Sequence, residues 1–459
     1  MSDLREFVKA YDVRGIVPDQ LNADVARACG TAFVRVLSAE APVTSIVVAH
    51  DMRPSSPDLA NAFAEGAAAQ GVDVTMAGLG STDLLYFAAG HLDVPGAMFT
   101  ASHNPARYNG IKMCRAKALP IGLETGLAEI RDLAQEIVDG GGPPPADNPG
   151  TITESDLLGA YAAHLRSLVD LTGIRPLKIV IDAGNGMAGY TVPAVLGSQV
   201  LEPLPLHIVP MYFELDGTFP NHEANPLDPA NLVDLQQAVV EHGADIGLAF
   251  DGDADRCFFI DESGAPVSPS AVTALVAARE LAKHPGATII HNLITSAAVP
   301  EIVLESGGVP VRTRVGHSFI KAEMARTGAV FGGEHSAHYY FKEFWGADTG
   351  MLAAMHMLAA LGEQDRPLSQ VAAEYERYVS SGEINSTVAD PLAKLAEVEA
   401  AMIGVHTDHL DGLTVRFDDG GWINVRPSNT EPLLRLNVEA PTAARMKELR
   451  EAALAVIRG

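Results

Sequence analysis

The chain of 459 residues has few cysteines, few basic residues and no long apolar run. Its three cysteines, Cys29, Cys114 and Cys257, lie far apart, so they indicate no disulfide framework or zinc spacing and favour a reducing compartment. Lysine and arginine total 32 against 58 aspartates and glutamates, which gives a formal net charge of −26. Because nucleic acids and anionic membranes bind basic faces, we expect neither as a partner.

No stretch approaches the roughly 18 apolar residues that a membrane span needs. The first residues, Met-Ser-Asp-Leu-Arg-Glu, carry charge where a signal peptide has an apolar core. We therefore expect a cytoplasmic protein, either a monomer or a weak dimer. If its substrate is anionic, the site must be a local basic island in an acidic protein.

Hydrophobic residues make up 47% of the chain, and a single core rarely grows beyond about 250–300 residues, so two to four domains are expected. Three segments, which begin at Ser45, Leu177 and Ala287, share one pattern: an apolar strand, a turn rich in Asp, Asn, Ser or Gly, and a helix. This βαβ pattern predicts three similar α/β domains. The C-terminal part lacks the pattern, and we interpret it as a smaller α+β domain.

Three breaks in the sequence suggest where these domains end. Residues 139–150 contain three consecutive glycines and then three prolines, which cannot continue a helix. The apolar strand 246–250 ends at a second break, and residues 364–367 mark a third. We expect domains at residues 1–150, 151–255, 256–367 and 368–459.

Asp251, Asp253 and Asp255 alternate along Asp-Gly-Asp-Ala-Asp-Arg, directly after an apolar strand. On a strand they would lie ~6.6 Å apart, too far to hold one ion, and on a helix positions i and i+2 do not face each other. A curled loop would bring all three together, and Gly252 favours such a curl. Clustered carboxylates repel one another without a cation, and ligands that are all oxygen favour Mg²⁺ or Ca²⁺ over zinc.

Two other interpretations compete with a metal site at this loop. An acidic surface turn is common in so acidic a chain, but the apolar residues on both sides argue against an idle turn. An EF-hand calcium loop has glycine at its sixth position, whereas here glycine is second. A metal site is favoured, and Mg²⁺ usually keeps a place for a phosphate oxygen.

Ser102 lies in Thr-Ala-Ser-His-Asn-Pro, residues 100–105, between an apolar run and a loop with glycine. It lacks the Gly-x-Ser-x-Gly context of a hydrolase nucleophile, and the adjacent His103 need not point the same way. A helix cap or a turn is another interpretation, since serine before Asn-Pro suits either. An exposed serine together with a Mg²⁺ loop suits phosphoryl transfer, with the serine oxygen as the phosphate carrier.

Four motifs follow one another along the chain: residues 100–105, residues 251–256, Gly-Glu-His-Ser-Ala-His at 333–338 and Arg-Pro-Ser-Asn-Thr-Glu-Pro at 426–432. In this order they resemble the α-D-phosphohexomutase family, above all its phosphomannomutase branch. The resemblance extends over essentially the whole chain, with one motif in each expected domain. It implies an α/β fold of three similar mixed domains and a smaller C-terminal α+β domain around a central cleft.

The resemblance implies an isomerase that interconverts mannose 6-phosphate and mannose 1-phosphate, a step that supplies GDP-mannose precursors. Ser102 would be phosphorylated and would bind one Mg²⁺ per chain together with Asp251, Asp253 and Asp255. The phosphoserine would phosphorylate the free sugar hydroxyl to give a hexose 1,6-bisphosphate, which turns over and returns its other phosphate to the serine. Phosphoglucomutase or phosphoglucosamine mutase activity is the alternative; a sugar-phosphate phosphatase or a non-catalytic binder is a rival from another class.

Glu334 and Ser336, spaced i and i+2, would share one face of an extended segment and hold adjacent sugar hydroxyls. The resemblance assigns them the hexose 3- and 4-hydroxyls. It places His338, which continues the same face, near the reacting hydroxyl as a catalytic residue.

The motif from Arg426 suits a phosphate clamp. A guanidinium can hold a phosphate through two hydrogen bonds, and Ser428, Asn429 and Thr430 add short donors. The resemblance adds Lys112 as a general acid or base and Arg14 as a further catalytic residue. The remaining residues that it assigns to substrate binding are Tyr11, His103, Arg256 and His317.

Overall fold

The computed structural model describes residues 3–9, 11–427 and 433–459, and the side chain of His317 is not among the described parts. The chain forms two compact units, the first of residues 1–267 with 336–369 and the second of residues 268–335 with 370–459. Among the described residues, no helix is both long and apolar enough to span a membrane.

The first sheet of the first unit has, within the described ranges, six strands in the order β1-β5-β4-β2-β3-β6. Strands β2, β3, β4 and β6 are parallel, whereas β5 is antiparallel to both β1 and β4. The strands are β1 (Val13–Ile16), β2 (Ser45–His50), β3 (Asp73–Leu79), β4 (Gly96–Phe99), β5 (Tyr108–Cys114) and β6 (Ile152–Glu154). The helices are α1 (Ala23–Glu40), α2 (Ser56–Ala68), α3 (Thr82–Leu92) and α4 (Leu127–Val138), with short 3₁₀ turns at η1 (Leu4–Glu6), η2 (Ala116–Ala118) and η3 (Leu123–Thr125).

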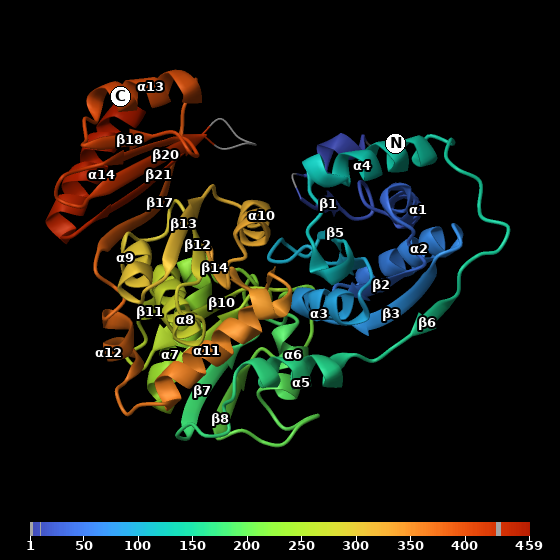
Figure 1. Cartoon of the computed structure of the whole chain (residues 1–459), viewed down its shortest axis with the longest axis horizontal. Coiled ribbons are helices and arrows are strands. Elements are labelled where there is room, and N and C mark those ends of the chain that lie inside the picture. The colour runs from blue at the N-terminus through green and yellow to red at the C-terminus, as the bar shows by residue number, and fades with distance from the viewer. Residues whose placement is uncertain (1–2, 10, 428–432) are drawn as a thin grey trace. The chain divides into compact units, whose positions relative to one another are not determined.

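Helices α1, α2 and α4 cover one face of this sheet (Figure 1), where their apolar residues form one core with the strands. Helix α1 begins at Asn22, whose side chain accepts from the N–H groups of Asp24 and Val25. Helix α3 begins at Ser81, whose hydroxyl accepts from the N–H of Leu84. These caps fix where each helix starts, and the start of α3 adjoins the candidate site.

The second sheet of this unit has five strands in the described part of the chain, in the order β11-β10-β9-β7-β8. Strands β7, β8 and β9 are parallel, and β10 is antiparallel to β9. The strands are β7 (Leu177–Asp182), β8 (Leu206–Met211), β9 (Ile246–Phe250), β10 (Cys257–Asp261) and β11 (Pro266–Val267). The helices are α5 (Leu158–Leu168), α6 (Ala188–Val195) and α7 (Val233–His242), with the 3₁₀ turn η4 (Pro229–Leu232) before α7. Because β10 pairs with β9, the second sheet continues beyond residue 255, where a domain boundary is expected from the sequence.

The first unit is completed by residues 336–369. An antiparallel hairpin of β15 (Tyr339–Phe341) and β16 (Ala347–Asp348) encloses the 3₁₀ turn η5 (Lys342–Phe344). Helix α11 (Gly350–Gly362) follows, capped by the hydroxyl of Thr349, and every one of its residues is buried.

The second unit contains three parallel strands, with β12 (Thr288–Asn292) between β13 (Val309–Thr313) and β14 (Phe331–Gly333). Its helices in this part are α8 (Pro269–Lys283), α9 (Ala298–Glu305) and α10 (His317–Thr327). The C-terminal part, preceded by α12 (Leu368–Ala373), is an antiparallel sheet in the order β17-β21-β20-β19-β18, covered by α13 and α14. Its elements are β17 (Val379–Thr387), α13 (Pro391–Ala401), β18 (His406–Asp408), β19 (Leu413–Arg416), β20 (Trp422–Pro427), β21 (Leu433–Ala440) and α14 (Ala443–Arg458).

One succession of elements occurs three times along the chain: strand, helix, strand, helix, strand, loop, strand. It runs from β2 to β5, from β7 to β10 and from β12 to β15. The loop before the last strand contains residues 100–107 in the first copy, 251–256 in the second and 334–338 in the third. The predicted three α/β domains and a C-terminal α+β domain are confirmed, and each copy carries its motif in the same place.

Candidate active site

Ser102 lies in the connection between β4 and β5, at the carboxyl end of parallel strands of the first sheet. Its φ of 49° is in the left-handed region, which costs a non-glycine residue roughly 1–2 kcal/mol. Its N–H donates to Oγ1 of Thr100 at 2.9 Å. The expectation of an exposed serine is wrong, because packing of the loop leaves only 4% of Ser102 exposed. The residues that follow form turns, so Ser102 does not cap a helix.

Asp251, Asp253 and Asp255 lie in the turn between the antiparallel strands β9 and β10. All three are buried, and one carboxylate oxygen from each lies within 4.8 Å of the others. The predicted curl is therefore present. Its left-handed residue is Ala254, with a φ of 59°.

Gly252 has a different role from the one expected of it. A Cβ atom at this position would lie 2.4 Å from the carbonyl oxygen of Ser102, which is closer than real contacts allow. The missing side chain therefore lets residues 251–256, the aspartate loop, lie directly against residues 100–107, the serine loop.

The hydroxyl of Ser102 donates to Oδ2 of Asp251 at 2.9 Å. The same oxygen accepts from Nε and an Nη of Arg256 at 2.9 and 2.7 Å, and that Nη lies 3.4 Å from Oγ of Ser102. Burial raises the pKa of Asp251 to about 8, against the lowering effect of Arg256. The serine oxygen therefore faces both a carboxylate and a guanidinium.

His103 lies within the same contacts, with its Nδ1 2.5 Å from an Nη of Arg256 and 3.3 Å from Oγ of Ser102. Burial and the neighbouring charge of Arg256 lower the pKa of His103 to about 2. Its Nδ1 therefore accepts from Arg256. Such a weakly basic ring is unsuited to remove a proton from the serine.

Lys112, on β5, places its Nζ 2.6 Å from Oδ2 of both Asp253 and Asp255. Burial opposes the charge of the ammonium, but the two carboxylates outweigh it and hold the pKa of Lys112 well above its usual range. Burial likewise opposes the charge of Asp255, yet Lys112 and His338 lower its pKa to about 2. As it lies here, Lys112 is a proton donor.

The donor set also fits a small divalent cation. Oδ1 of Asp253 and Oδ1 of Asp255 are buried and accept no hydrogen bond from any residue that the structure describes. Buried carboxylate oxygens without a donor carry a large desolvation cost, which a bound cation offsets. All-oxygen ligands of this kind suit Mg²⁺.

Thr82, at the start of α3, makes two hydrogen bonds to Asp253. Its hydroxyl donates to Oδ2 of Asp253 at 2.6 Å, and its N–H donates to the carbonyl oxygen of the same residue at 3.0 Å. Sequence reasoning missed Thr82. A Ser-Thr-Asp run before an apolar helix signals only a helix start.

Arg14, on β1, donates to Oδ1 of Asn104 and to Oδ2 of Asp12, at 2.6 Å each. It therefore lies against the serine loop, as expected. Tyr11, just before β1, is 38% exposed.

Ser336 and His338 also belong to the first unit. Oγ of Ser336 lies 3.0 Å from Nδ1 of His338, whose Nε2 lies 3.8 Å from Oδ1 of Asp255. The prediction that residues 334–338 are extended is wrong, because residues 335–336 form a turn and Ala337 has a φ of 64°. The turn replaces the alternation that would have aligned Glu334, Ser336 and His338 on one face.

In the second unit, Glu334 follows β14 and is buried. Its Oε1 accepts from the side-chain amide of Asn292 and from the N–H of Gly316, at 3.2 Å each. Asn292 thus orients the carboxylate, a role with no signal in the sequence. His317 is the first residue of α10, and its side chain lies outside the described parts.

Arg426, on β20, donates to Oε2 of Glu383 at 2.7 Å. Burial lowers its pKa despite the charge of Glu383. Its Nε is buried and donates to no residue in the described part of the chain. Ser428, Asn429 and Thr430 lie outside the described residues.

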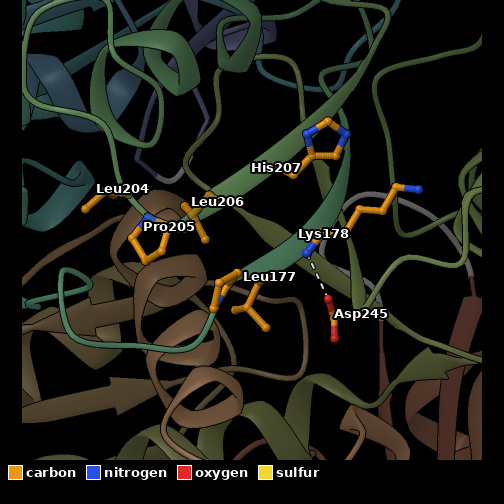
Figure 2. Close-up of a pocket in the computed structure, with 8 residues that line it drawn as sticks. Leu177, Lys178, Leu204, Pro205, Leu206, His207 and Asp245 are labelled. Atoms are coloured by element: carbon orange, nitrogen blue, oxygen red, sulfur yellow. Dashed lines mark hydrogen bonds between the residues drawn. The ribbon is translucent and has the colours of Figure 1, made fainter.

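The cavities found in the described part of the chain are not lined by predicted site residues. One of about 570 Å³ is lined by residues of β7, β8 and their flanks, and Figure 2 shows the N–H of Lys178 donating to Asp245 at its edge. It adjoins the start of β7, whereas ligands of α/β sheets bind at the carboxyl ends of the strands. None of its lining residues is a predicted site residue.

Sequence models of the phosphoglucomutase/phosphomannomutase family match four stretches of the chain. Alpha/beta/alpha domains I, II and III match residues 5–139, 159–264 and 269–378, and the C-terminal domain matches residues 383–456. The chain belongs to this family. The predicted family, fold class and enzyme class are confirmed, and the protein is a phosphohexomutase, an isomerase.

Individual relatives agree along nearly the full length. A protein of Xanthomonas campestris pv. campestris named "Phosphohexose mutases" is 42% identical over 449 residues, 96% of each chain. A phosphomannomutase of Salmonella montevideo is 40% identical over 438 residues, 94% of each chain. The crystal structure of a phosphoglucomutase/phosphomannomutase family protein from Burkholderia thailandensis superposes with a TM-score of 0.86 at 32% identity, covering 99% of this chain and 98% of that one.

Proposed function

We propose that this phosphohexomutase interconverts mannose 6-phosphate and mannose 1-phosphate, with Ser102 as the phosphate carrier. The observation that carries the proposal is the 2.9 Å hydrogen bond from Oγ of Ser102 to Asp251, inside a buried cluster of three aspartates. A hydroxyl so placed is next to oxygen ligands for Mg²⁺ and to the guanidinium of Arg256.

We propose one Mg²⁺ per chain, held by Asp251, Asp253 and Asp255 with an oxygen of phosphorylated Ser102. When bound, it would supply charge neutralisation at the phosphoryl oxygens. The two carboxylate oxygens without a donor, on Asp253 and Asp255, support this assignment.

The protein's own side chains supply positive charge and a proton. Arg256, within 3.4 Å of the serine oxygen, would orient the phosphate that Ser102 carries. As the phosphate leaves for the free sugar hydroxyl, the bond from phosphorus to Oγ of Ser102 breaks and a bond to the sugar oxygen forms. Lys112 and His338 lie against the same aspartates and are the proposed groups that exchange protons with the sugar oxygens, while Arg14 steadies the serine loop.

The sugar is proposed to bind through Glu334 and Ser336, and its distal phosphate through Arg426 with Ser428, Asn429 and Thr430. Asn292 supports the role of Glu334, because it fixes the carboxylate in one orientation. Tyr11, His103 and His317 are proposed further contacts. Mannose and glucose differ only at the 2-hydroxyl, so a second activity on glucose phosphates is compatible with these contacts.

We further propose that the domains end near the predicted breaks, with the second extended to include β11. A hexose 1,6-bisphosphate is the proposed intermediate and activator, and the hexose phosphate the proposed partner, with no nucleic acid or membrane involved. A cytoplasmic location is proposed as well, supported by three buried cysteines that are all free.

The proposal is tested by following ³¹P signals of mannose 1-phosphate and 6-phosphate with the purified enzyme, Mg²⁺ and hexose 1,6-bisphosphate. We expect interconversion, a phosphate on Ser102 by peptide mass mapping, and loss of nearly all activity in Ser102→Ala. No interconversion by the phosphorylated enzyme would refute the proposal. Inorganic phosphate released as fast as the isomer forms would show a phosphatase instead.

A further inference from the structure

Arg53 makes an unusual set of hydrogen bonds to the backbone of the serine loop. It lies between β2 and α2, and its side chain is fully buried. One Nη donates to the carbonyl oxygens of Ser102 and Asn104 at 2.8 and 2.7 Å. The other donates to those of Pro105 and Tyr108 at 3.1 and 3.0 Å.

Asp51, Phe219 and Gly217 make further contacts with Arg53. Its Nε donates to Oδ2 of Asp51 at 3.2 Å, so all five N–H donors of the group are used. Oδ1 of Asp51 accepts from the N–H of Arg53 and from the hydroxyl of Ser56. The ring of Phe219, from the second domain, lies 5.1 Å from the guanidinium carbon, and a Cβ on Gly217 would lie 2.7 Å from Cα of Arg53.

These contacts determine which way Ser102 faces. Its carbonyl oxygen accepts from the guanidinium of Arg53 and lies so close to Gly252 that a Cβ there would be 2.4 Å away, while its hydroxyl donates to Asp251. The φ of 49° at Ser102 is unfavourable for serine, so the surrounding contacts must maintain it. Among the described contacts, Arg53 is the side chain that holds three carbonyls of this loop and that of Tyr108, the first residue of β5, at once.

We propose that Arg53 is a positioning residue for phosphoryl transfer, because it fixes the serine loop in the conformation that turns Oγ of Ser102 toward the aspartates. Arg53 contacts no reacting atom in this arrangement. The inference rests on the proposed role of Ser102 as phosphate carrier. It predicts a loss in the rate of phosphate transfer rather than in sugar-phosphate binding.

Arg166 offers a matched control, since its guanidinium also donates to three backbone carbonyls. Its acceptors are Val195, Gly197 and Glu202, which belong to neither the serine loop nor the aspartate loop. Removal of either arginine leaves carbonyls without a charged donor. Only Arg53 is expected to act on catalysis.

The experiment compares Arg53→Ala, Arg53→Lys and Arg166→Ala in the full chain with Mg²⁺. In Arg53→Ala we expect kcat to fall by on the order of 10²-fold with KM little changed. Lysine keeps the charge but not the planar fork, so Arg53→Lys should recover only part of the rate. Guanidinium chloride at low millimolar concentration should raise kcat of Arg53→Ala and leave Arg166→Ala unaffected.

A second readout follows the half reaction directly by intact mass. With hexose 1,6-bisphosphate, a phosphorus–oxygen bond to the sugar breaks, a bond to Oγ of Ser102 forms, and the hydroxyl proton passes to the sugar oxygen released. Dephosphorylated wild type should gain one phosphate quickly, and Arg53→Ala slowly. If wild type gains none, the proposed function fails. If wild type is labelled and Arg53→Ala keeps kcat within about threefold of it, the positioning role fails.

Arg53→Ala could fail to fold, because the residue is fully buried. Phe219→Leu then tests the role of Arg53 without changing it. This variant removes the partly exposed aromatic ring beside the guanidinium but keeps every hydrogen bond of the arginine. A lower kcat at unchanged KM in Phe219→Leu supports the inference. A kcat equal to wild type in both Phe219→Leu and Arg53→Lys overturns it.

Discussion

The hydroxyl of Thr82 donates to Oδ2 of Asp253 across 2.6 Å, although 171 positions separate the two residues along the chain. Thr82 begins a helix of the first domain, whereas Asp253 lies in a turn of the second. The other oxygen, Oδ1 of Asp253, is buried and accepts from no residue that the structure describes. A helix start therefore orients a proposed metal ligand.

Thr82→Val should weaken Mg²⁺ binding. Valine has the shape of threonine but cannot donate, so Oδ2 of Asp253 keeps the bond from Lys112 and loses the one from Thr82, and affinity should fall about tenfold or more. Isothermal titration calorimetry of the dephosphorylated protein with Mg²⁺ measures this affinity in the absence of any reaction. Thr191→Val is the control, because its buried hydroxyl donates to the carbonyl of Met187 within the same domain. Equal Mg²⁺ affinity in the two variants would contradict the role of Thr82.

Gly252→Ala should separate the serine and aspartate loops. The added Cβ would lie 2.4 Å from the carbonyl oxygen of Ser102, so one loop must shift. We expect a loss of about 1–3 kcal/mol in the free energy of unfolding and a fall in kcat on the order of 10²-fold. Gly159→Ala is the control, because its Cβ, in α5, would meet no atom outside the neighbouring backbone within 4 Å, so it should lower neither the stability nor kcat. Wild-type activity in Gly252→Ala would show that the loops need not touch.

Asn292→Ala should raise KM for the hexose phosphate. The change removes the amide that holds Oε1 of Glu334, and a lost hydrogen bond to a carboxylate corresponds to about tenfold in affinity. Steady-state kinetics should show a smaller change in kcat than in KM. Asn231→Ala, where the amide donates to the carbonyl of Asn225, is the control. An unchanged KM would mean that Glu334 is oriented without Asn292.

His222 should make thermal stability depend on pH. Burial opposes its charge, but the 2.9 Å contact of its Nε2 with Asp182 outweighs burial and raises its pKa. Because the folded pKa exceeds the unfolded value near 6.5, the stabilisation is complete below about pH 6.5 and is lost as pH rises through the folded value.

The comparison uses His222→Gln and the exposed control His207→Gln. Relative to wild type, His222→Gln should lower the midpoint of thermal unfolding more at about pH 6 than at about pH 9. If His222→Gln lowers the midpoint of thermal unfolding equally at both pH values, the protonation of His222 is not coupled to folding.

The α/β repeats could be predicted from sequence because a short apolar strand, a polar turn and a helix recur with clear spacing. The expected boundary after residue 255 cuts through the second sheet, since an antiparallel return such as β10 leaves no signal distinct from the start of a new domain. The clustering of Asp251, Asp253 and Asp255 could be predicted, because only a curled loop brings three alternating carboxylates together and apolar strands flank it.

Arg53 and Thr82 could not be found in this way. Their partners are backbone carbonyls or a carboxylate from another domain, and such contacts exist only after the chain has folded. The turn at Ala337 was missed for a related reason. Alanine rarely adopts a left-handed conformation, so its presence does not indicate one, whereas glycine or asparagine would have.

The serine loop, the aspartate loop and the segment 334–338 each join the third strand of a repeat to the strand that follows it. The proposed phosphate carrier, the proposed cation ligands and the proposed sugar contacts thus occupy the same connection in three repeats of one fold. Under these proposed roles, a change of sugar preference would need substitutions in one connection only, while the other two would keep the phosphate carrier and the cation ligands.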